Sequence, residues 1–235
     1  MTFLRWDAGE PYEVAFTTRV GGVSEGPFAS LNLGRRTGDD VERVDENRRL
    51  ACAEIGADAD RLALNHQFHS TLVHRARAGS RGERGDALWT DEPDLPVLAL
   101  SADCLPIALA RTNGGAAAVA VLHAGWRGLL DGIVERAVQV LGGDSLVAAI
   151  GPAIGPCCYD VRDDVGDPYR ARFGSDIVRD GRLDLWRAAE TALREAGVSR
   201  VDRFDLCTVC RPELFFSHRR DGKSRGVQGV LARVA

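Results

Sequence analysis

Two apolar stretches in the middle of the chain constrain its fold more than any other feature. They read LPVLALSADCLPIALA and GAAAVAVLHAGWRG. Continuous apolar runs of this length are typical of strands buried on both faces. The first run is broken at Asp103, Cys104 and Pro106, because proline cannot donate to a sheet ladder and restricts the residue before it. The second run ends at His123. We therefore expect buried strands that give way to turns at these residues.

The composition of the chain is that of a globular protein. Of its 235 residues, 45% are hydrophobic and 27% are charged, which is the usual balance of a soluble protein, and the length suits one domain over residues 1–235. The net charge of −4 argues against nucleic acid as a partner. No segment has the length of a membrane span, and the first residues do not resemble a signal peptide. We expect a cytoplasmic protein without a nucleic acid or membrane partner, and the oligomeric state is left open.

Segments with strand and helix patterns are mixed along the chain. Alternation of apolar and polar residues predicts strands, and apolar residues three or four positions apart predict helices. Asp184 is the expected cap and Gly197 the expected stop of the last helix. The mixture indicates an α+β fold. The predicted strands cover residues 12–20, 61–79, 145–151 and 226–234, and the predicted helices cover residues 39–56, 129–143 and 184–197.

The breaks in the two apolar stretches carry side chains that can bind a metal. Cys104 and His123 each lie where a strand gives way to a turn, so they can project into a cleft while the sheet holds their backbone. His69, in NHQFHS, is polar within a predicted strand and is a third candidate. Two imidazoles and a thiolate suit zinc, which lowers the pKa of bound water toward about 7. Their spacing leaves open that they are core histidines and a small apolar cysteine.

The other cysteines offer a second possible cluster. Cys157 and Cys158 are adjacent, and Cys207 and Cys210 form the sequence CTVC. A structural zinc with four thiolates is one interpretation, and a redox pair at CTVC is another. Adjacent cysteines rarely both fit a closed tetrahedral site, and buried thiols at the end of a strand are ordinary. The sequence therefore favours neither interpretation.

Six segments of the chain resemble the YfiH-like family, whose members are also called laccase-domain or polyphenol oxidase proteins. They are FTTRVGGVSEGPFASLNLG, GDDVERVDENR, ADCLPIAL, HAGWRG, GPAIGPCCYDV and FFSHRRDG, in the order and approximate spacing of that family. The resemblance spans nearly the whole chain, and ADC and HAGWRG are highly specific. It implies a four-layer α/β/β/α sandwich with a metal cleft at its surface.

The same resemblance implies a metal site and an activity. The family's metal ligands are the histidine of a QxHG-like motif, the cysteine of ADC and the histidine of HAGWRG, which match His69, Cys104 and His123 here. The implied cofactor is zinc, with copper as an alternative. The implied substrates are a purine nucleoside and phosphate: phosphorolysis of adenosine, inosine, guanosine and methylthioadenosine, with deamination of adenosine as a second activity.

Three positions depart from the family pattern. Ser70 stands where the family usually has glycine, Arg36 where it often has histidine, and SRGVQG replaces the more usual TGRQ near the end. The last two departures are expected to alter substrate contacts rather than the metal ligands. His66, His74 and His218 fall outside the ligand positions, and we interpret them as surface residues or as polar supports of the ligands.

Phosphorolysis requires cationic groups that hold phosphate, and the planar guanidinium of arginine does this with paired hydrogen bonds. The candidates are Arg48, Arg127 and Arg219, in that order, with a surface or salt-bridging arginine as the alternative for each. Asp103 and Asp39 are candidates for orienting other groups or carrying protons, and turn formation or capping explains them equally well. We expect the three metal ligands and Asp103 to take part in catalysis, and Asp39 and the arginines to bind substrate.

Three other functions stay open at this point. A hydrolase of a nucleotide-linked peptidoglycan precursor, a UDP-muramoyl amino acid, could use the metal water or Cys104 as its nucleophile. A copper-dependent phenol oxidase is suggested by the family name and by the ligand set. A conventional multicopper laccase is excluded, because it needs several further imidazoles and the chain has five histidines in all. The last alternative is a non-catalytic module that binds a metal or a nucleoside.

Overall fold

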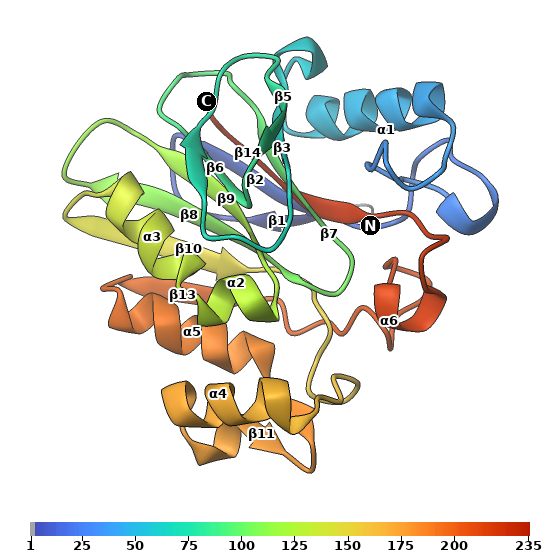
Figure 1. The fold of residues 1–235 in the computed structure, drawn as a ribbon. Coiled ribbons are helices and arrows are strands. Elements are labelled where there is room, and N and C mark those ends of the chain that lie inside the picture. Colours follow the sequence, from blue (N-terminus) through green and yellow to red (C-terminus); the bar gives the residue numbers. More distant parts are fainter. Residues whose placement is uncertain (1–2) are drawn as a thin grey trace.

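The computed structural model describes residues 3–235 and contains two large β-sheets with helices on their outer faces (Figure 1). The strands are β1 (Phe3–Trp6), β2 (Tyr12–Thr17), β3 (Ala63–His66), β4 (Val73–Arg75), β5 (Arg81–Arg84), β6 (Ala87–Thr90), β7 (Val97–Ser101), β8 (Leu105–Asn113), β9 (Val119–Ala124), β10 (Ser145–Ile150), β11 (Val178–Arg179), β12 (Arg182–Leu183), β13 (Arg200–Arg203) and β14 (Gln228–Val234). The α-helices are α1 (Val41–Glu54), α2 (Trp126–Leu130), α3 (Ile133–Leu141), α4 (Asp163–Phe173), α5 (Leu185–Glu195) and α6 (His218–Asp221), and single helical turns are η1 (Gly26–Phe28), η2 (Ala59–Arg61) and η3 (Ser175–Ile177).

Within residues 3–235 the two large sheets have six strands each. The first sheet has the order β1-β2-β14-β7-β3-β5, and the second has the order β13-β10-β8-β9-β6-β4. The first apolar stretch of the sequence supplies a strand to each: β7 ends at Ser101 in the first sheet, and β8 begins at Leu105 in the second. Residues 102–104 therefore carry the chain from one sheet to the other.

The predicted break at Pro106 is wrong. Pro106 is the second residue of β8 and pairs with His123 of β9, and its carbonyl accepts a hydrogen bond from the Gly151 N–H at 2.8 Å. A proline is tolerated there because it lies at the start of a strand, where a missing N–H interrupts little of the ladder. The break in the apolar stretch is thus confined to residues 102–104.

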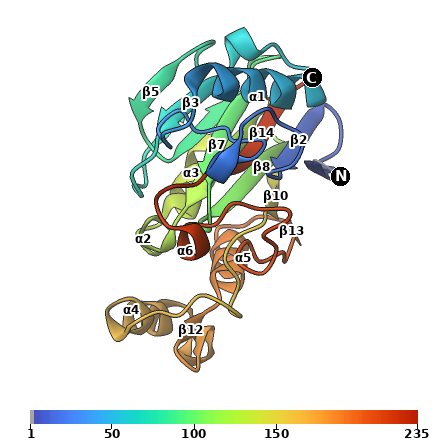
Figure 2. The same cartoon turned by 90° about the vertical axis from the view of Figure 1, so that its right-hand side faces the viewer.

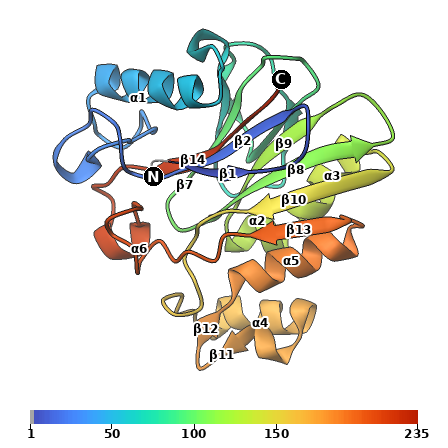
Figure 3. The same cartoon turned by 180° about the vertical axis from the view of Figure 1, so that it is seen from behind.

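Three apolar layers hold the sheets and helices together. Side chains of α1 pack with Leu98 and Leu231 on the outer face of the first sheet. The inner faces of the two sheets meet in a second layer around Phe16 and Val121. A third layer, around Leu109, joins the second sheet to α3, α4 and α5. In Figure 3, α1 and α5 lie on opposite sides of the strands. The four-layer α/β/β/α sandwich is confirmed.

Two of the predicted helices form close to the expected boundaries. The helix expected over residues 39–56 is α1, capped by the Asp40 carboxylate, which accepts from the Glu42 N–H at 2.8 Å. The helix expected over residues 184–197 is α5, and Asp184 accepts from the Arg187 N–H at 3.0 Å. In both cases the cap satisfies an N–H that has no partner within the helix.

Two other segments differ from the prediction. The helix expected over residues 129–143 is divided into α2 and α3 at Gly132, whose φ of 94° lies in the left-handed region that suits glycine. The strand expected over residues 61–79 is also wrong as a single element: it is β3 in the first sheet, a loop over residues 67–72, and β4 in the second sheet.

The α4 helix and the β11–β12 hairpin were not predicted from the sequence; they project away from the sheets (Figure 2). Pro168 lies inside α4, and an internal proline argues against a helix. No helix in the described part of the chain has the length and apolar character needed to cross a membrane.

Candidate metal centre

His69, Cys104 and His123 come together where the chain passes from one sheet to the other. His69 lies in the loop between β3 and β4, Cys104 in the crossing from β7 to β8, and His123 in β9. The antiparallel pairing of β8 with β9 sets Leu105 opposite Ala124 and so brings Cys104 close to His123. The Cys104 Sγ lies 3.7 Å from His69 Nε2, and the two imidazole rings meet edge to face with centroids 5.0 Å apart. One ligand atom of each residue lies within 4.8 Å of the other two.

The carboxylate of Asp86, which has no solvent exposure, orders this centre. Its Oδ1 accepts from His123 Nδ1 at 2.8 Å and from the His69 N–H at 3.0 Å. Its Oδ2 accepts from the Ser70 N–H and the Ser70 hydroxyl, both at 2.7 Å, and from the Phe68 N–H at 3.2 Å. Because Nδ1 of His123 donates to the carboxylate, Nε2 is the ring nitrogen that would bind a metal, once it has lost its proton.

Ser70, where the family usually has glycine, thus gains a function through its hydroxyl, which donates to Asp86. The loop that carries His69 is held by these contacts in an unusual conformation, since His69 has a φ of 65°. Only a few per cent of residues other than glycine adopt such a conformation, and it persists where surrounding contacts impose it. The direction of the His69 ring is therefore set by the Asp86 contacts rather than by a strand.

Gly125 of HAGWRG is required by close packing. A Cβ at this position would lie 2.5 Å from His69 Cδ2 and 3.1 Å from Cys104 Sγ. The first of these distances is shorter than any ordinary contact, so a larger residue would push His69 away. The glycine also precedes the first turn of α2. The motif thus supplies the His123 side chain and the space in which the other two candidate ligands meet it.

The three side chains influence one another's protonation. Burial opposes the thiolate of Cys104, but the neighbouring His123 and His69 outweigh burial and lower its pKa to about 6. Burial likewise opposes the imidazolium of His123, but Cys104 and Asp86 raise its pKa to about 10. At neutral pH the sulfur is therefore a thiolate, which is the form that binds metals.

The donor set of this centre fits a metal ion of the zinc class. Two imidazole nitrogens and one thiolate sulfur are ligands that zinc prefers, and three protein ligands leave a fourth position open, as in catalytic sites. His123 is buried and Cys104 half-buried, while His69 is exposed, so the centre is reached from one side. A metal would be held by Cys104 Sγ and by imidazole nitrogens of His69 and His123.

A cavity of about 840 Å³ opens onto the candidate centre. Its wall carries several cationic side chains, and no aspartate or glutamate lines it within the described part of the chain. The residues that define its chemistry are Arg35, Arg36, Arg48, Arg81, Lys223 and Arg225, with His66, His69, Cys104, His123 and His218. The chain as a whole has a net charge of −4, so this concentration of positive charge is local and favours an anionic ligand.

Arg48, which is buried, and Arg225, which is half-buried, are only partly hydrogen-bonded within the described part of the chain. Arg48 is 4% exposed and donates through Nε to the Leu33 carbonyl at 2.9 Å. Burial and the neighbouring Arg35 and Arg81 lower its pKa to about 10, so it is still a cation at neutral pH. Arg225 donates to the Gly222 carbonyl at 3.1 Å, but its buried Nε has no partner. An unsatisfied buried donor such as Arg225 Nε is costly, and an acceptor bound in the cavity would satisfy it.

Several residues predicted to act at the site lie outside the cavity wall. The Arg127 guanidinium stacks on Trp126, 5.0 Å from the ring centroid, and the Arg219 guanidinium stacks on Tyr159, 5.3 Å from its centroid. Asp39 accepts from the Ser24 hydroxyl at 2.6 Å. None of these three predicted residues is among those that line the cavity.

Asp103 is buried beside Cys104, but its carboxylate points to other segments. It accepts from the Thr208 hydroxyl at 2.5 Å, the Ser217 hydroxyl at 3.1 Å and the Arg219 N–H at 2.7 Å. These contacts tie the turn that carries Cys104 to the loop after β13 and to the start of α6. Asp103 therefore positions the turn, and the structure shows no contact between its carboxylate and the candidate metal ligands.

Asp86 and most of the cationic wall were not predicted from the sequence. Asp86 precedes a short strand in the sequence RGERGDALW, where it looks like an ordinary turn residue. Its partners lie 16 and 37 residues away along the chain. His66 and His218, interpreted as surface residues or supports, both line the cavity, whereas His74 bonds to the Arg84 carbonyl and does not.

The fold and the site together define a class of protein: a four-layer sandwich of two sheets with a His-Cys-His centre in the wall of a cationic cavity. Residues 13–234 match the family described as multi-copper polyphenol oxidoreductase laccase. The chain belongs to this laccase-like YfiH family.

Its curated relatives have about the same length. A purine nucleoside phosphorylase of Haemophilus influenzae is 32% identical over 96% of both chains. A purine nucleoside phosphorylase of Deinococcus radiodurans is 39% identical over 90% of this chain and 85% of its own. Among solved structures, YlmD from Geobacillus stearothermophilus is 34% identical with a TM-score of 0.89 and covers all of this chain and 97% of its own. A protein from Neisseria meningitidis has the same TM-score at 33% identity and covers all of this chain and 99% of its own.

Proposed function

We propose that this chain catalyses the phosphorolysis of purine nucleosides, with a zinc ion held by His69, Cys104 and His123. The observation that carries this proposal is the cavity in which the three side chains lie beside a wall of arginine and lysine. About 840 Å³ is within the usual range for pockets that hold a small organic ligand, and accommodates a nucleoside together with phosphate. The relatives named purine nucleoside phosphorylases support the same reaction.

The positive wall suits the nucleophile of this reaction. An oxygen of inorganic phosphate bonds to C1′ of the ribose while the bond from C1′ to the purine nitrogen breaks, and the purine leaves with the bonding electrons and takes up a proton. Phosphate carries negative charge and accepts hydrogen bonds, so Arg48 and Arg225 hold it in the position of attack. The imidazoles of His66 and His218 in the wall are the candidate donors of the proton.

Zinc bound at the three ligands supplies Lewis acidity beside the substrate, with copper as the alternative ion. Asp86 orients His123 and the loop of His69, and Asp103 positions the turn of Cys104. For adenosine, we propose a second reaction in which water replaces the amino group of the purine and ammonia leaves. The substrates proposed for the first reaction are adenosine, inosine, guanosine and methylthioadenosine.

The first experiment measures release of the base from these four nucleosides with and without phosphate, by chromatography, in protein whose metal content is determined in the same preparation. We expect free base and the sugar 1-phosphate in equal amounts only when phosphate is present, ribose 1-phosphate from three of the nucleosides and methylthioribose 1-phosphate from methylthioadenosine, and inosine from adenosine without phosphate. Zinc-loaded protein that releases no base from any of the four would overturn the proposal.

A pair of variants tests the role of the cationic wall. Arg225→Gln removes a charged donor from the cavity, whereas Arg136→Gln removes one from the exposed face of α3, where Arg136 contacts Gln139. A hydrogen bond from a charged group contributes about 1.5–3 kcal/mol, so we expect the KM for phosphate to rise roughly tenfold or more in Arg225→Gln. Arg136→Gln should leave it unchanged. Equal kinetics in the two variants would contradict this assignment of Arg225.

The same preparations separate the other functions. Release of an amino acid from a UDP-muramoyl amino acid, without phosphorolysis, would identify a hydrolase of peptidoglycan precursors. Oxygen uptake with a phenol by copper-loaded protein alone would identify an oxidase. Stoichiometric binding of a nucleoside without any turnover would identify a binding module.

A further inference from the structure

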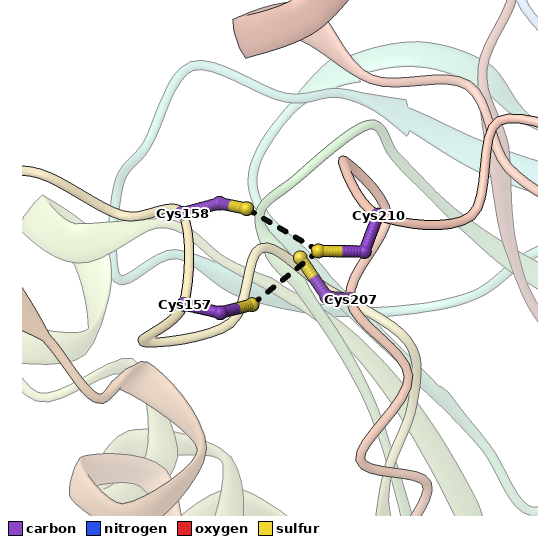
Figure 4. Close-up of side chains that lie close together, drawn as sticks. All are labelled: Cys157, Cys158, Cys207 and Cys210. Atoms are coloured by element: carbon purple, nitrogen blue, oxygen red, sulfur yellow. Dashed lines mark hydrogen bonds between the residues drawn. The ribbon is translucent and has the colours of Figure 1, made fainter.

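Four cysteines outside the cavity converge on one point. Cys157 and Cys158 lie in the turn between β10 and α4, and Cys207 and Cys210 follow β13. Figure 4 shows all four side chains directed toward one another from these two loops. The four Sγ atoms lie within 4.8 Å of one another, and all four residues are free cysteines.

The distances between the sulfurs are those of metal ligands rather than of a bonded pair. Cys210 Sγ lies 3.6 Å from Cys157 Sγ and 3.4 Å from Cys158 Sγ. Four sulfurs about 2.3 Å from a tetrahedral zinc ion are about 3.8 Å from each other. A disulfide bond is far shorter, at about 2.05 Å. The cluster therefore needs only small adjustments to enclose an ion.

The local backbone explains how two adjacent cysteines reach the same point. The N–H groups of Cys158 and Tyr159 both donate to the Gly155 carbonyl, at 2.9 and 3.0 Å, which closes a tight turn. This turn directs both thiols toward Cys210 (Figure 4). The objection that adjacent cysteines rarely share a closed site therefore does not apply to this loop.

The two loops are already joined by backbone contacts. The backbones of Cys207 and Ala153 form an isolated parallel β-bridge, and the Thr208 N–H donates to the Ala153 carbonyl at 3.0 Å. The Gly155 N–H donates to Cys207 Sγ at 3.4 Å. Hydrogen bonds from backbone N–H groups to sulfur stabilise a thiolate ligand. The position of the sulfurs is thus imposed by the fold, and a bound ion would not have to gather them.

We propose that Cys157, Cys158, Cys207 and Cys210 form a second metal site, which takes zinc as a four-coordinate structural ion. Soft thiolate donors in a tetrahedral arrangement select zinc over magnesium or calcium. Four protein ligands leave no open position, so the ion fastens the two loops and does not react. This site does not depend on the function proposed for the cavity.

The second site is connected to the first through Asp103. Thr208, between the cysteines of CTVC, donates to the Asp103 carboxylate at 2.5 Å, and the Ile154 N–H donates to the Asp103 carbonyl at 2.9 Å. Both loops of the cluster therefore contact the residue next to Cys104. The ion positions the turn that carries Cys104 by holding these two loops together.

Counting the metal in matched variants tests the proposal. Protein produced with zinc and purified without chelators is analysed by mass spectrometry for metal per chain. We expect two zinc ions in the native chain, one in Cys104→Ala, one in the double variant Cys157→Ala/Cys210→Ala, and two in Cys52→Ala. Cys52 is the matched control because it is a buried residue of α1 and lies in a different core layer.

Cobalt substitution supplies a readout that does not require the double variant to fold. Cys104→Ala keeps all four cysteines of the cluster, so we expect it to bind one Co²⁺ with intense visible absorption and sulfur-to-metal charge-transfer bands. X-ray absorption of the zinc form of the same variant should show only sulfur neighbours, near 2.3 Å. Cys104→Ala protein that binds neither Zn²⁺ nor Co²⁺ would overturn the proposal. So would a disulfide among these cysteines in protein isolated without oxygen.

Discussion

The Asp86 carboxylate accepts hydrogen bonds from both sides of the candidate metal centre, from His123 and from the loop that carries His69. Asp86→Asn replaces one acceptor oxygen with an NH₂ donor. This donor would face N–H groups, or would favour the tautomer of His123 that carries its proton on Nε2 instead of Nδ1. Loss of such a supporting carboxylate lowers metal affinity by about 10–100-fold. Competition with a chelating dye should show a decrease of that size.

Asp91→Asn is the control for this change. Asp91 pairs with Arg75 on the surface, so its substitution removes a negative charge without touching the centre. Its metal affinity should equal that of the native chain. An affinity in Asp86→Asn equal to that in Asp91→Asn would show that Asp86 does not orient the ligands.

The thiol of Cys104 should react at unusually low pH in protein freed of metal by a chelator. Burial opposes its ionisation, but the two histidines lower its pKa to about 6, whereas a cysteine in an unfolded chain has a pKa of about 8.5. The thiolate is the reactive form, so alkylation should be slow below pH 6 and reach half its maximal rate near that pH.

Peptide mapping distinguishes Cys104 from the other thiols in this alkylation experiment. Burial raises the pKa of Cys52 to about 12, so that residue should stay unmodified over the same range. A midpoint near pH 8.5 for Cys104 would contradict the effect assigned to His123 and His69. Added zinc should protect Cys104 from alkylation.

At the level of helices and strands, the short segment from β9 into α2 determines how closely the candidate ligands approach. Gly125→Ala places a methyl group 2.5 Å from His69 Cδ2. The loop of His69 has to move, so we expect metal affinity to fall at least tenfold while the far-ultraviolet circular dichroism is unchanged.

Gly166→Ala in α4 is the matched control. A Cβ there meets only the end of the flexible Arg170 side chain, at 3.3 Å, and alanine favours a helix over glycine. This variant should bind metal as the native chain does and be at least as stable. Metal binding by Gly125→Ala as tight as that by Gly166→Ala would contradict the packing argument.

The layer of apolar side chains between the two sheets fixes how the sheets lie relative to each other. The candidate site depends on it, because His123 belongs to one sheet and His69 and Cys104 lie in segments that connect the two. Leu88 of β6 lies in this layer and is 3% exposed. Leu88→Ala leaves a cavity and should lower the free energy of unfolding by about 2–5 kcal/mol. Leu72→Ala, at a side chain that is 46% exposed, should change it by less than about 0.5 kcal/mol. Denaturant unfolding of the two variants measures both, and equal stabilities would contradict a packed layer at Leu88.

The sequence by itself determined the kind of fold and most of its regular elements. Apolar periodicity and capping residues are local signals, which is why α1, α5 and β10 could be predicted near their observed bounds. The resemblance to the YfiH-like family supplied the four layers and pointed to His69, Cys104 and His123, since those motifs are recognisable without any contact being known.

Only the tertiary structure decided how these residues meet. The single strand expected over residues 61–79 divides between two sheets, because Asp86 binds the loop between them through partners distant in sequence. The cationic wall contains arginines from separate parts of the chain, among them Arg48 of α1 and Arg81 of β5. The four cysteines lie in two loops, and their spacing in the sequence does not indicate the turn at Gly155 that brings them together. Contacts of this kind depend on where the chain returns in space, and local residue patterns carry no record of that.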